Sequence, residues 1–404
     1  MTEKKLLPFL GIISCLFLAV TLGVFCKDVV PEIAPRMDFI SYWCTSRMLL
    51  EGENLYDFDR LFEREKTLGW QQETPLIMFN PPWLAVLVIP LALLKYEHAA
   101  YFWMIINLLV SFLSSALLWR VYAREKFPGY LGLVWAVTII FYPTLLIIWL
   151  GQMTWLTLLG ISGFLYFYKE ERDYLCGIFL VLMTIKPNLM LILFPIILFL
   201  IIYQRRYKIF LSSGVLFLLL IAILTAYFPS WLQDYLGVAL EKPPLDLKTP
   251  TIRYMAYKYL VGENIIQYFT LIFAPITILA FINWRKLIKL EEAMGTIIVM
   301  TFLSTIFCWS YDFVLFLIPI FEILSFSVLR SGLRGSKIGK MFLIFLFISN
   351  GILYWQGIKE IPNYVSVWFI PFFTVLFFVF RYKLMVTVQG AGLRQSGYYQ
   401  TQDL

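Results

Sequence analysis

The chain has 404 residues, of which 60% are apolar, 18% aromatic and only 15% charged, and its mean hydropathy is +0.78. A soluble domain has about 45–50% apolar and about 25% charged residues, so this composition excludes an ordinary water-soluble protein. The net charge of +7 does not indicate nucleic-acid binding, because most basic residues lie in short clusters at the ends of apolar runs. With one histidine, His98, a His-based metal site is nearly excluded.

Apolar runs recur along the whole chain, and many approach the roughly 20 residues with which a helix crosses a bilayer. The alternation of a membrane β-barrel is absent, so these runs predict helices. The first run, residues 6–25, follows Lys4 and Lys5 and is expected to be an uncleaved first helix whose N-terminus lies inside. The further runs are residues 83–94, 99–121, 130–150, 153–168, 174–185, 189–203, 209–228, 265–284, 293–309, 313–329, 341–355 and 364–380.

The charges at the ends of these runs predict the topology. Clusters of Lys and Arg are expected to mark the inner face of a cell membrane, with both termini cytoplasmic. The run at residues 83–94 breaks the alternation of sides and is short, so it is expected to be re-entrant or interfacial, unless one charge cluster is wrongly assigned. We predict an all-α polytopic membrane protein with about 11 to 13 transmembrane helices in a single membrane domain. The clusters are Arg120/Arg124/Lys126, Arg205/Arg206/Lys208, Arg285/Lys286/Lys289, Arg330/Arg334/Lys337/Lys340 and Arg381/Lys383.

The first long polar segment, residues 27–80, is net acidic and is expected on the outer face. From Asp38 to Leu50, aromatic and aliphatic residues recur at helical spacing, and Gly52 follows where a helix would stop. Tyr42 in this stretch is a residue type of the membrane interface, so the helix is predicted to lie in the outer interface.

Two more short helices are predicted in the outer segments. One covers residues 59–68 and ends at Gly69. The other belongs to the second large outer segment, residues 229–264, where Ser230 is expected to cap a helix. Its predicted buried side contains Trp231, Leu232, Tyr235 and Leu236.

Polar residues lie at the predicted outer ends of otherwise apolar helices. On the predicted topology they all face the same side of the membrane, and this coincidence predicts a functional site. They are Asp38, Asn80, Gln152, Lys186, Arg253, Tyr254, Tyr257 and Asp312.

Each of these residues also has a purely structural interpretation. Asp38 can be a carboxylate favoured by the dipole at a helix N-terminus. Lys186 can extend to lipid headgroups, and Arg253 can be solvated in its loop. Gln152 can satisfy a broken helix end, as can Asn80, and Asp312 can pair with a nearby Lys or Arg.

Six short motifs follow one another along most of the chain. They are Met37-Asp38-Phe39-x-x-Tyr42, Gly52-x-Asn54-x-Tyr56-Asp57, Asn80-Pro81-Pro82, Gly151-Gln152, Lys186-Pro187 and Ser310-Tyr311-Asp312. This ordered set resembles glycosyltransferase family 87. One departure lies in the second outer segment, where relatives often carry an Asn-Gln-Ser type sequence and this chain has Thr251-Ile252-Arg253.

The resemblance implies a GT-C-like fold and an inverting glycosyltransferase. Such an enzyme moves a sugar, here a mannose-like hexose, from a polyprenyl-phosphate donor to a hydroxyl of a lipid or glycan acceptor at the outer face. The functional carboxylate of the family falls on Asp38, the expected catalytic residue, and Lys186 and Arg253 are expected to bind the donor phosphate. No metal or cofactor is expected, and the partners are membrane lipid, the lipid-linked donor and the acceptor. Candidates for the substrate pocket are Tyr42, Tyr56, Asn80, Gln152, Tyr257 and Asp312.

Two other functions stay open. A lipid or solute transporter or flippase also needs a polytopic bundle with buried charges, and Glu322 within an apolar run and the Lys186-Pro187 break favour it. The acidic outer segment with its predicted interfacial helices favours the enzyme. An O-antigen-ligase-like enzyme is expected to use basic and histidine residues in a late outer loop, and residues 229–264 contain no histidine.

Overall fold

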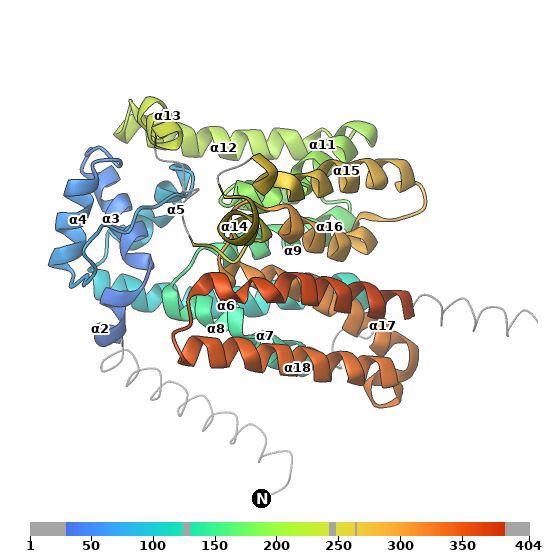
Figure 1. Cartoon of the computed structure of the whole chain (residues 1–404). Coiled ribbons are helices and arrows are strands. Elements are labelled where there is room, and N and C mark those ends of the chain that lie inside the picture. The colour runs from blue at the N-terminus through green and yellow to red at the C-terminus, as the bar shows by residue number, and fades with distance from the viewer. Residues whose placement is uncertain (1–29, 124–129, 242–247, 263–264, 384–404) are drawn as a thin grey trace, which may run out of the picture. The chain divides into compact units, whose positions relative to one another are not determined.

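The structure, a computed structural model, describes residues 30–123, 130–241, 248–262 and 265–383 (Figure 1). It is 80% helical and contains no strand in these ranges. The chain forms two compact units. Unit 1 comprises Met1–Leu108, Ile148–Gln152 and Leu220–Lys242, and unit 2 comprises Leu109–Ile147, Met153–Leu219 and Pro243–Leu404. The predicted helix at residues 6–25 lies outside the described residues, as do Lys4, Lys5, Arg124 and Lys126 and the side chains of Arg330 and Arg334.

The predicted all-α polytopic membrane fold is confirmed. Within the described ranges, six helices are long and apolar enough to cross a membrane, or seven if one bent pair counts as a single span. Three of the six are α6 (Tyr96–Ala123), α12 (Lys208–Tyr227) and α18 (Lys337–Ile358). The other three are Ile265–Trp284, which includes α15 (Phe273–Trp284), Ser310–Ser327, which includes the first part of α17 (Leu317–Gly335), and Asn363–Lys383.

This number is lower than the about 11 to 13 crossings predicted, because several apolar runs form helices shorter than the roughly 20 residues of a crossing. The segments α5 (Trp83–Ala92), α10 (Asp173–Met183) and α11 (Leu193–Tyr203) have 10 or 11 residues. Two further helices, α9 (Thr154–Lys169) and α16 (Leu290–Ser304), have 16 and 15 residues. At 1.5 Å per residue, α5 is about 15 Å long, which agrees with the expectation that it is no simple crossing.

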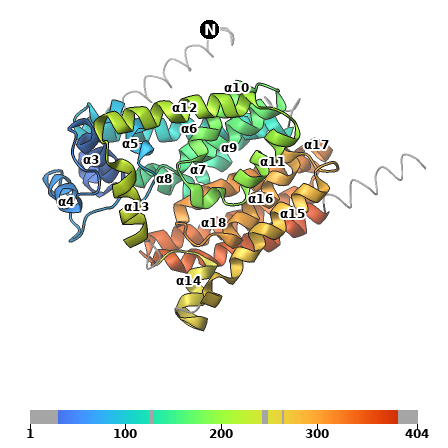
Figure 2. The same cartoon turned by 90° about the horizontal axis from the view of Figure 1, so that it is seen from above.

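Unit 1 is built around α3 (Phe39–Leu50), which packs against α4 (Phe58–Thr67) and α5 (Figure 2). The two helices predicted within residues 27–80 form where the sequence places them. Gly52 and Gly69 follow them at φ +69° and +93°, the left-handed conformation that ends a helix. Tyr42, expected at a membrane interface, is instead buried within the unit.

The third short helix, α13 (Trp231–Glu241), begins directly after Ser230. The prediction of its buried side is wrong for Leu232 and Leu236, which are 51% and 48% exposed. The hydroxyl of Ser230 bonds to the carboxylate of Asp234 at 2.6 Å, so the side chains of this first turn pair with each other.

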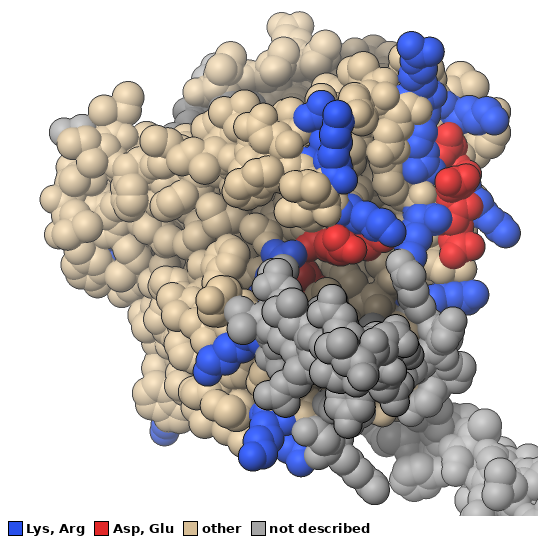
Figure 3. Space-filling view, turned by 90° about the vertical axis from the view of Figure 1, so that its right-hand side faces the viewer, with Lys and Arg blue, Asp and Glu red and all other residues tan. Residues whose placement is uncertain are grey.

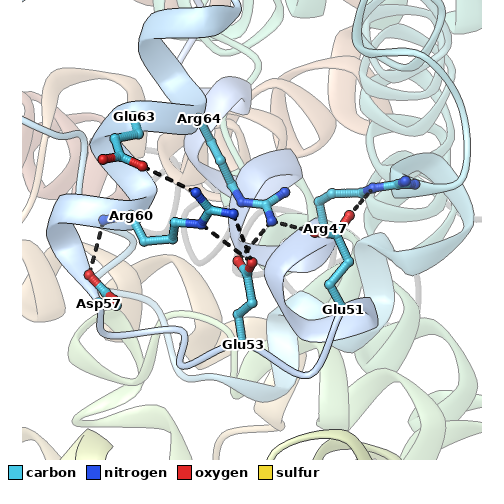
Figure 4. Close-up of polar contacts among 7 residues, drawn as sticks. All are labelled: Arg47, Glu51, Glu53, Asp57, Arg60, Glu63 and Arg64. Atoms are coloured by element: carbon cyan, nitrogen blue, oxygen red, sulfur yellow. Dashed lines mark hydrogen bonds and ion pairs between the residues drawn. The ribbon is translucent and has the colours of Figure 1, made fainter.

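An ion-pair network ties the turn after α3 to α4 (Figure 4). Glu51 and Glu53 accept hydrogen bonds from Arg64, the latter at 2.8 Å, and Arg47 lies 2.8 Å from Glu51. Arg60 lies 3.3 Å from Glu53. A single exposed ion pair contributes little to the stability of the fold, but a network around two carboxylates fixes how α3 and α4 are joined.

Glu65 points inward from α4 and is fully buried. Its Oε2 accepts the backbone N–H of Leu76 at 3.0 Å, and Ser41 of α3 donates to the carbonyl of the same residue. Burial raises the pKa of Glu65 from 4.5 to about 7. Glu65 and Ser41 therefore hold the irregular segment that leads to Asn80 and α5.

Unit 2 contains α15, α16, α17 and α18, in which each helix packs against the next (Figure 1). Phenylalanine rings of residues 310–316 pack against phenylalanine rings of the helix at Asn363–Lys383. The rings of Phe313 and Phe369 are 5.3 Å apart, and those of Phe316 and Phe373 are 4.6 Å apart.

A broken span stands where the sequence predicts one crossing at residues 130–150. The helices α7 (Leu131–Ile140) and α8 (Tyr142–Leu150) meet at an angle of 64°. Asn350 of α18 hydrogen-bonds to backbone groups that have no helical partner at the break. Its Oδ1 accepts from Tyr142 N at 2.7 Å and its Nδ2 donates to Ile140 O at 2.9 Å. A buried backbone group needs such a partner in an apolar environment.

Glu322, which the sequence leaves without a role, has a structural partner inside unit 2. Arg381 Nε lies 3.2 Å from its Oε1, and Gly295 N donates to its Oε2 at 3.1 Å. A Cβ atom at Gly295 would overlap this carboxylate, so glycine leaves the space that the carboxylate occupies. Arg381 therefore compensates the buried charge of Glu322 within unit 2.

Basic side chains gather on the face of the molecule at the right of Figure 1, as Figure 3 shows. The guanidinium of Arg285, after α15, lies 4.8 Å from the ring centroid of Tyr203 at the end of α11. Arg206, before α12, lies 2.5 Å from Asp173 at the start of α10. Such gathering at one end of unit 2 is the pattern expected of an inner membrane face.

Candidate functional site

Asp38 lies at the first position before α3 and is half-buried in unit 1. Its side chain makes no hydrogen bond that caps this helix. Instead its Oδ2 accepts a hydrogen bond from Nε2 of Gln152. The carboxylate therefore does not act as a simple helix cap but contacts the segment that follows α8.

Gln152 is oriented by a second hydrogen bond. The hydroxyl of Tyr42 lies 2.9 Å from Gln152 Oε1, and both side chains are buried. An amide has one acceptor oxygen and one donor nitrogen. Because Tyr42 donates to the oxygen, the nitrogen donates toward Asp38.

Gly151 allows this segment to approach the start of α3. Its φ is +66°, and a Cβ atom there would lie 2.8 Å from Met37 Cε and from Phe39 Cβ. Trp103 Nε1 donates to Gly151 O at 2.8 Å, and its ring stacks on Phe39 with centroids 5.1 Å apart. Glycine is therefore required at this position both for the conformation and for the close contact.

Lys186 and Asp312 form a buried ion pair in unit 2. Lys186 directly precedes the short helix η5 (Pro187–Met190), and its Nζ lies 2.5 Å from Asp312 Oδ1. It also lies 4.6 Å from the ring centroid of Tyr311. Lys186 is 7% exposed and Asp312 is 1% exposed, so Lys186 does not extend to lipid headgroups.

Both oxygens of Asp312 are occupied. Asp312 lies in η9 (Ser310–Phe316), and its Oδ1 accepts a 2.6 Å hydrogen bond from Thr154 in addition to the Lys186 contact. Its Oδ2 accepts Trp309 N at 2.8 Å. The expectation that Asp312 pairs with a basic residue holds, and its partner is Lys186.

The loops around this pair contact one another within unit 2. Asn188 donates to Phe307 O at 2.7 Å. The thiol of Cys308 lies 3.7 Å from Pro250 O, and Asn363 donates to Ser310 Oγ at 2.7 Å. The loop ends that the sequence assigns to one side of the membrane thus meet at one end of the unit.

Arg253 lies in α14 (Ile252–Ala256), which Thr251 caps by accepting Tyr254 N at 3.1 Å. It is 4% exposed, so it is not the solvated loop residue of the structural interpretation. Its Nε donates to Gln267 Oε1 at 2.9 Å. Its guanidinium lies 5.8 Å from the ring centroid of Tyr257 and 5.3 Å from that of Tyr268.

Two of the predicted pocket residues lie elsewhere in unit 1. Tyr56 packs against Phe228 and Tyr235, with ring centroids 6.4 Å and 6.3 Å apart, and burial raises the pKa of its hydroxyl. Asn80 is half-buried and directly precedes Pro81-Pro82 at the start of α5. The contacts described for Tyr56 are with Phe228, which directly follows α12, and with Tyr235 of α13.

The sequence did not single out Thr154 or Tyr311 as partners of the ion pair. Thr154 lies in an apolar helix that also contains Thr157, and nothing in the sequence distinguishes the two hydroxyls. In the described ranges of the chain, no group of three or more His, Cys, Asp and Glu side chains is placed to hold a metal ion.

Comparison with known proteins places this chain in a family. Residues 79–310, more than half of the chain, match the family model of Glycosyltransferase family 87. The matched stretch contains Gln152, Lys186 and Arg253, whereas Asp38 precedes it and Asp312 follows it. No curated protein and no solved structure matches the chain.

Proposed function

The chain belongs to glycosyltransferase family 87, and on that premise we propose that it moves a sugar from a polyprenyl-phosphate donor to an acceptor hydroxyl. The donor sugar is a mannose-like hexose and the acceptor is a membrane lipid or glycan. The reaction takes place in a GT-C-like fold at the outer face of the cell membrane, with both termini cytoplasmic. The observation that carries the proposal is a half-buried carboxylate, Asp38, held by a glutamine that fixes its orientation.

The proposed chemistry is a single displacement with inversion. The acceptor oxygen bonds to the anomeric carbon while the bond from that carbon to the phosphate oxygen breaks, and the electron pair leaves with prenyl phosphate. A phosphate leaving group needs no proton, so one base is enough, in contrast to the paired carboxylates of a glycosidase. Asp38 is that base and takes the proton of the attacking hydroxyl.

Lys186 and Arg253 hold the donor phosphate and stabilise the charge that develops on it. Lysine acts as a point charge with three N–H donors, whereas the planar guanidinium of arginine can bind two oxygens at once. Asp312 engages one donor of Lys186. In the part of the chain that the structure describes, the other two N–H groups make no hydrogen bond and face a ligand in this proposal.

A transfer assay tests this function. Purified protein is incubated with short-chain prenyl-phosphate mannose, glucose or arabinofuranose and with extracted membrane lipid. Release of prenyl phosphate that depends on both one of these sugars and the lipid acceptor is the expected result. Folded protein that releases none from any donor contradicts the proposal.

The two other functions are less well supported. Glu322, the buried charge that favoured a transporter or flippase, is paired with Arg381 and Gly295 N. For an O-antigen-ligase-like enzyme, residues 229–264 lack the histidine that this class is expected to use. With the protein reconstituted in vesicles, lipid movement across the bilayer without prenyl phosphate release would favour the transporter.

A further inference from the structure

A segment of four residues, Gly151 to Thr154, carries two polar side chains that bind two carboxylates. Gln152 donates to Asp38 in unit 1, and Thr154 donates to Asp312 at 2.6 Å in unit 2. Only Met153, which is fully buried, separates them.

The hydrogen bonds at Gln152 have a fixed direction. Tyr42 donates to its Oε1, so its Nε2 is presented to Asp38 Oδ2. The Asp38 carboxylate is thereby fixed in one orientation. A general base needs such a fixed position in order to meet the proton that it takes.

Thr154 acts on the ammonium group of Lys186 indirectly, through the carboxylate of Asp312. Thr154 and Lys186 both contact Asp312 Oδ1, and Trp309 N binds the other oxygen at 2.8 Å. The carboxylate is thus fixed by its neighbours, and it in turn fixes the position of the ammonium group. Removing Thr154 Oγ1 takes away one of the two hydrogen bonds that orient Asp312 besides its contact with Lys186, so the ammonium group is held less firmly.

We propose that Gln152 and Thr154 are positioning residues, and that this one segment sets the base through Gln152 and the phosphate-binding lysine through Thr154. The inference rests on the proposed function and adds to it a division of roles. Gln152 affects the chemical step, whereas Thr154 affects the binding of the donor.

Kinetics of purified full-length variants separate these roles. Gln152→Leu is expected to lower kcat by about 10–100-fold with a nearly unchanged donor KM, since outer partners of functional groups contribute effects of this size. Thr154→Val is expected to raise the donor KM by about 10-fold or more, and Thr154→Ser to restore it. The matched control is Thr157→Val. Thr157 Oγ1 is buried in the same helix and has no hydrogen-bond partner among the described residues.

A pH profile distinguishes positioning from a structural role. Gln152→Glu places a second carboxyl group beside Asp38, and two carboxylates that share a site do not both ionise at their usual pH. The acidic limb of kcat/KM against pH is expected to move upward by about one unit or more. A structural role would lower the rate equally at all pH values. Thermal unfolding of each variant checks that it is folded.

The outcomes are distinct. Folded Gln152→Leu and Thr154→Val variants with the kinetics of Thr157→Val overturn the inference while the transfer activity of the wild type upholds the function. The same holds if Gln152→Glu leaves the acidic limb in place. A wild-type protein that transfers none of the three sugars overturns the proposed function, and the inference with it.

Discussion

The ammonium nitrogen of Lys186 lies 2.5 Å from Asp312 Oδ1, and the two side chains are 8% and 1% exposed. Breaking a buried ion pair by neutralising one partner costs about 3–5 kcal/mol, because the other charge stays buried and unpaired. Asp312→Asn should therefore lower the thermal unfolding temperature strongly. Lys186→Met/Asp312→Asn should recover most of that loss, because no uncompensated charge remains, yet stay inactive.

The control for this pair is an exposed one. Arg60 and Glu63 lie 3.1 Å apart with exposures of 48% and 69%, and a surface pair contributes at most about 1 kcal/mol. Glu63→Gln should change the unfolding temperature little. If the double variant at Lys186 and Asp312 is no more stable than Asp312→Asn alone, the ion-pair account is wrong.

Gly151→Ala tests the close approach of the Gly151–Thr154 segment to α3. A non-glycine residue at φ +66° is strained by about 1–3 kcal/mol, and its Cβ would collide with Met37 and Phe39 at 2.8 Å. We expect lower stability and a large loss of transfer activity. Gly351→Ala in α18 is the control, since a Cβ there meets no atom within 4 Å. Equal effects of the two substitutions would refute the argument.

Asn350→Leu tests the broken span. It removes the acceptor for Tyr142 N and one of the donors to Ile140 O, which Tyr354 also contacts at 3.1 Å. A buried backbone group without a partner costs about 1–3 kcal/mol, so the unfolding temperature should fall. Ser349→Ala is the neighbouring control, because among the described residues Ser349 bonds only to Leu346 O within its own helix. An unchanged unfolding temperature in Asn350→Leu would show that the break is stable without it.

How far the sequence predicts the fold depends on what ends each helix. Gly52 and Gly69 predict the ends of α3 and α4 because their left-handed conformation is a local property of the chain. The break between α7 and α8 has a local signal in Pro143, since proline lacks a backbone N–H and is placed at the start of a helix rather than inside one. Its partner Asn350 is 208 residues from Tyr142, so the local sequence does not identify the side chain that satisfies the break. Counting apolar runs gives more crossings than the described residues contain as long helices, because runs such as those of α5, α10 and α11 form helices of 10 or 11 residues.

The same limit applies to the candidate site. Residue type and predicted side of the membrane were enough to single out Asp38, Gln152, Lys186 and Asp312. Their pairing was not predictable, because Gln152 is 114 residues from Asp38 and Lys186 is 126 residues from Asp312. Only the folded chain distinguishes residues available to a substrate from residues that hold another side chain.

The buried carboxylate of Glu65 predicts a pH dependence of stability. Its pKa in the fold, about 7, is above its usual 4.5, so its favourable contribution is complete below pH 4.5 and is lost as the pH rises through 7. We expect the unfolding temperature of the wild type to fall between about pH 4.5 and pH 7 and to level off above that range. Glu65→Gln should reduce this fall, because the amide cannot ionise and its oxygen can still accept Leu76 N. Parallel curves for the two proteins would contradict the assignment.

The rate of sugar transfer by Asp38→Asn tests the central claim most directly. The amide keeps the size of the side chain and loses the base, which contributes about 10²–10⁴-fold to such reactions. Asp59→Asn, an exposed carboxylate of the same outer segment, is the matched control. With a saturating prenyl-phosphate sugar, we predict that Asp38→Asn is slower by at least about 10²-fold while Asp59→Asn transfers at the wild-type rate. A folded Asp38→Asn protein that transfers sugar as fast as the wild type would contradict the account.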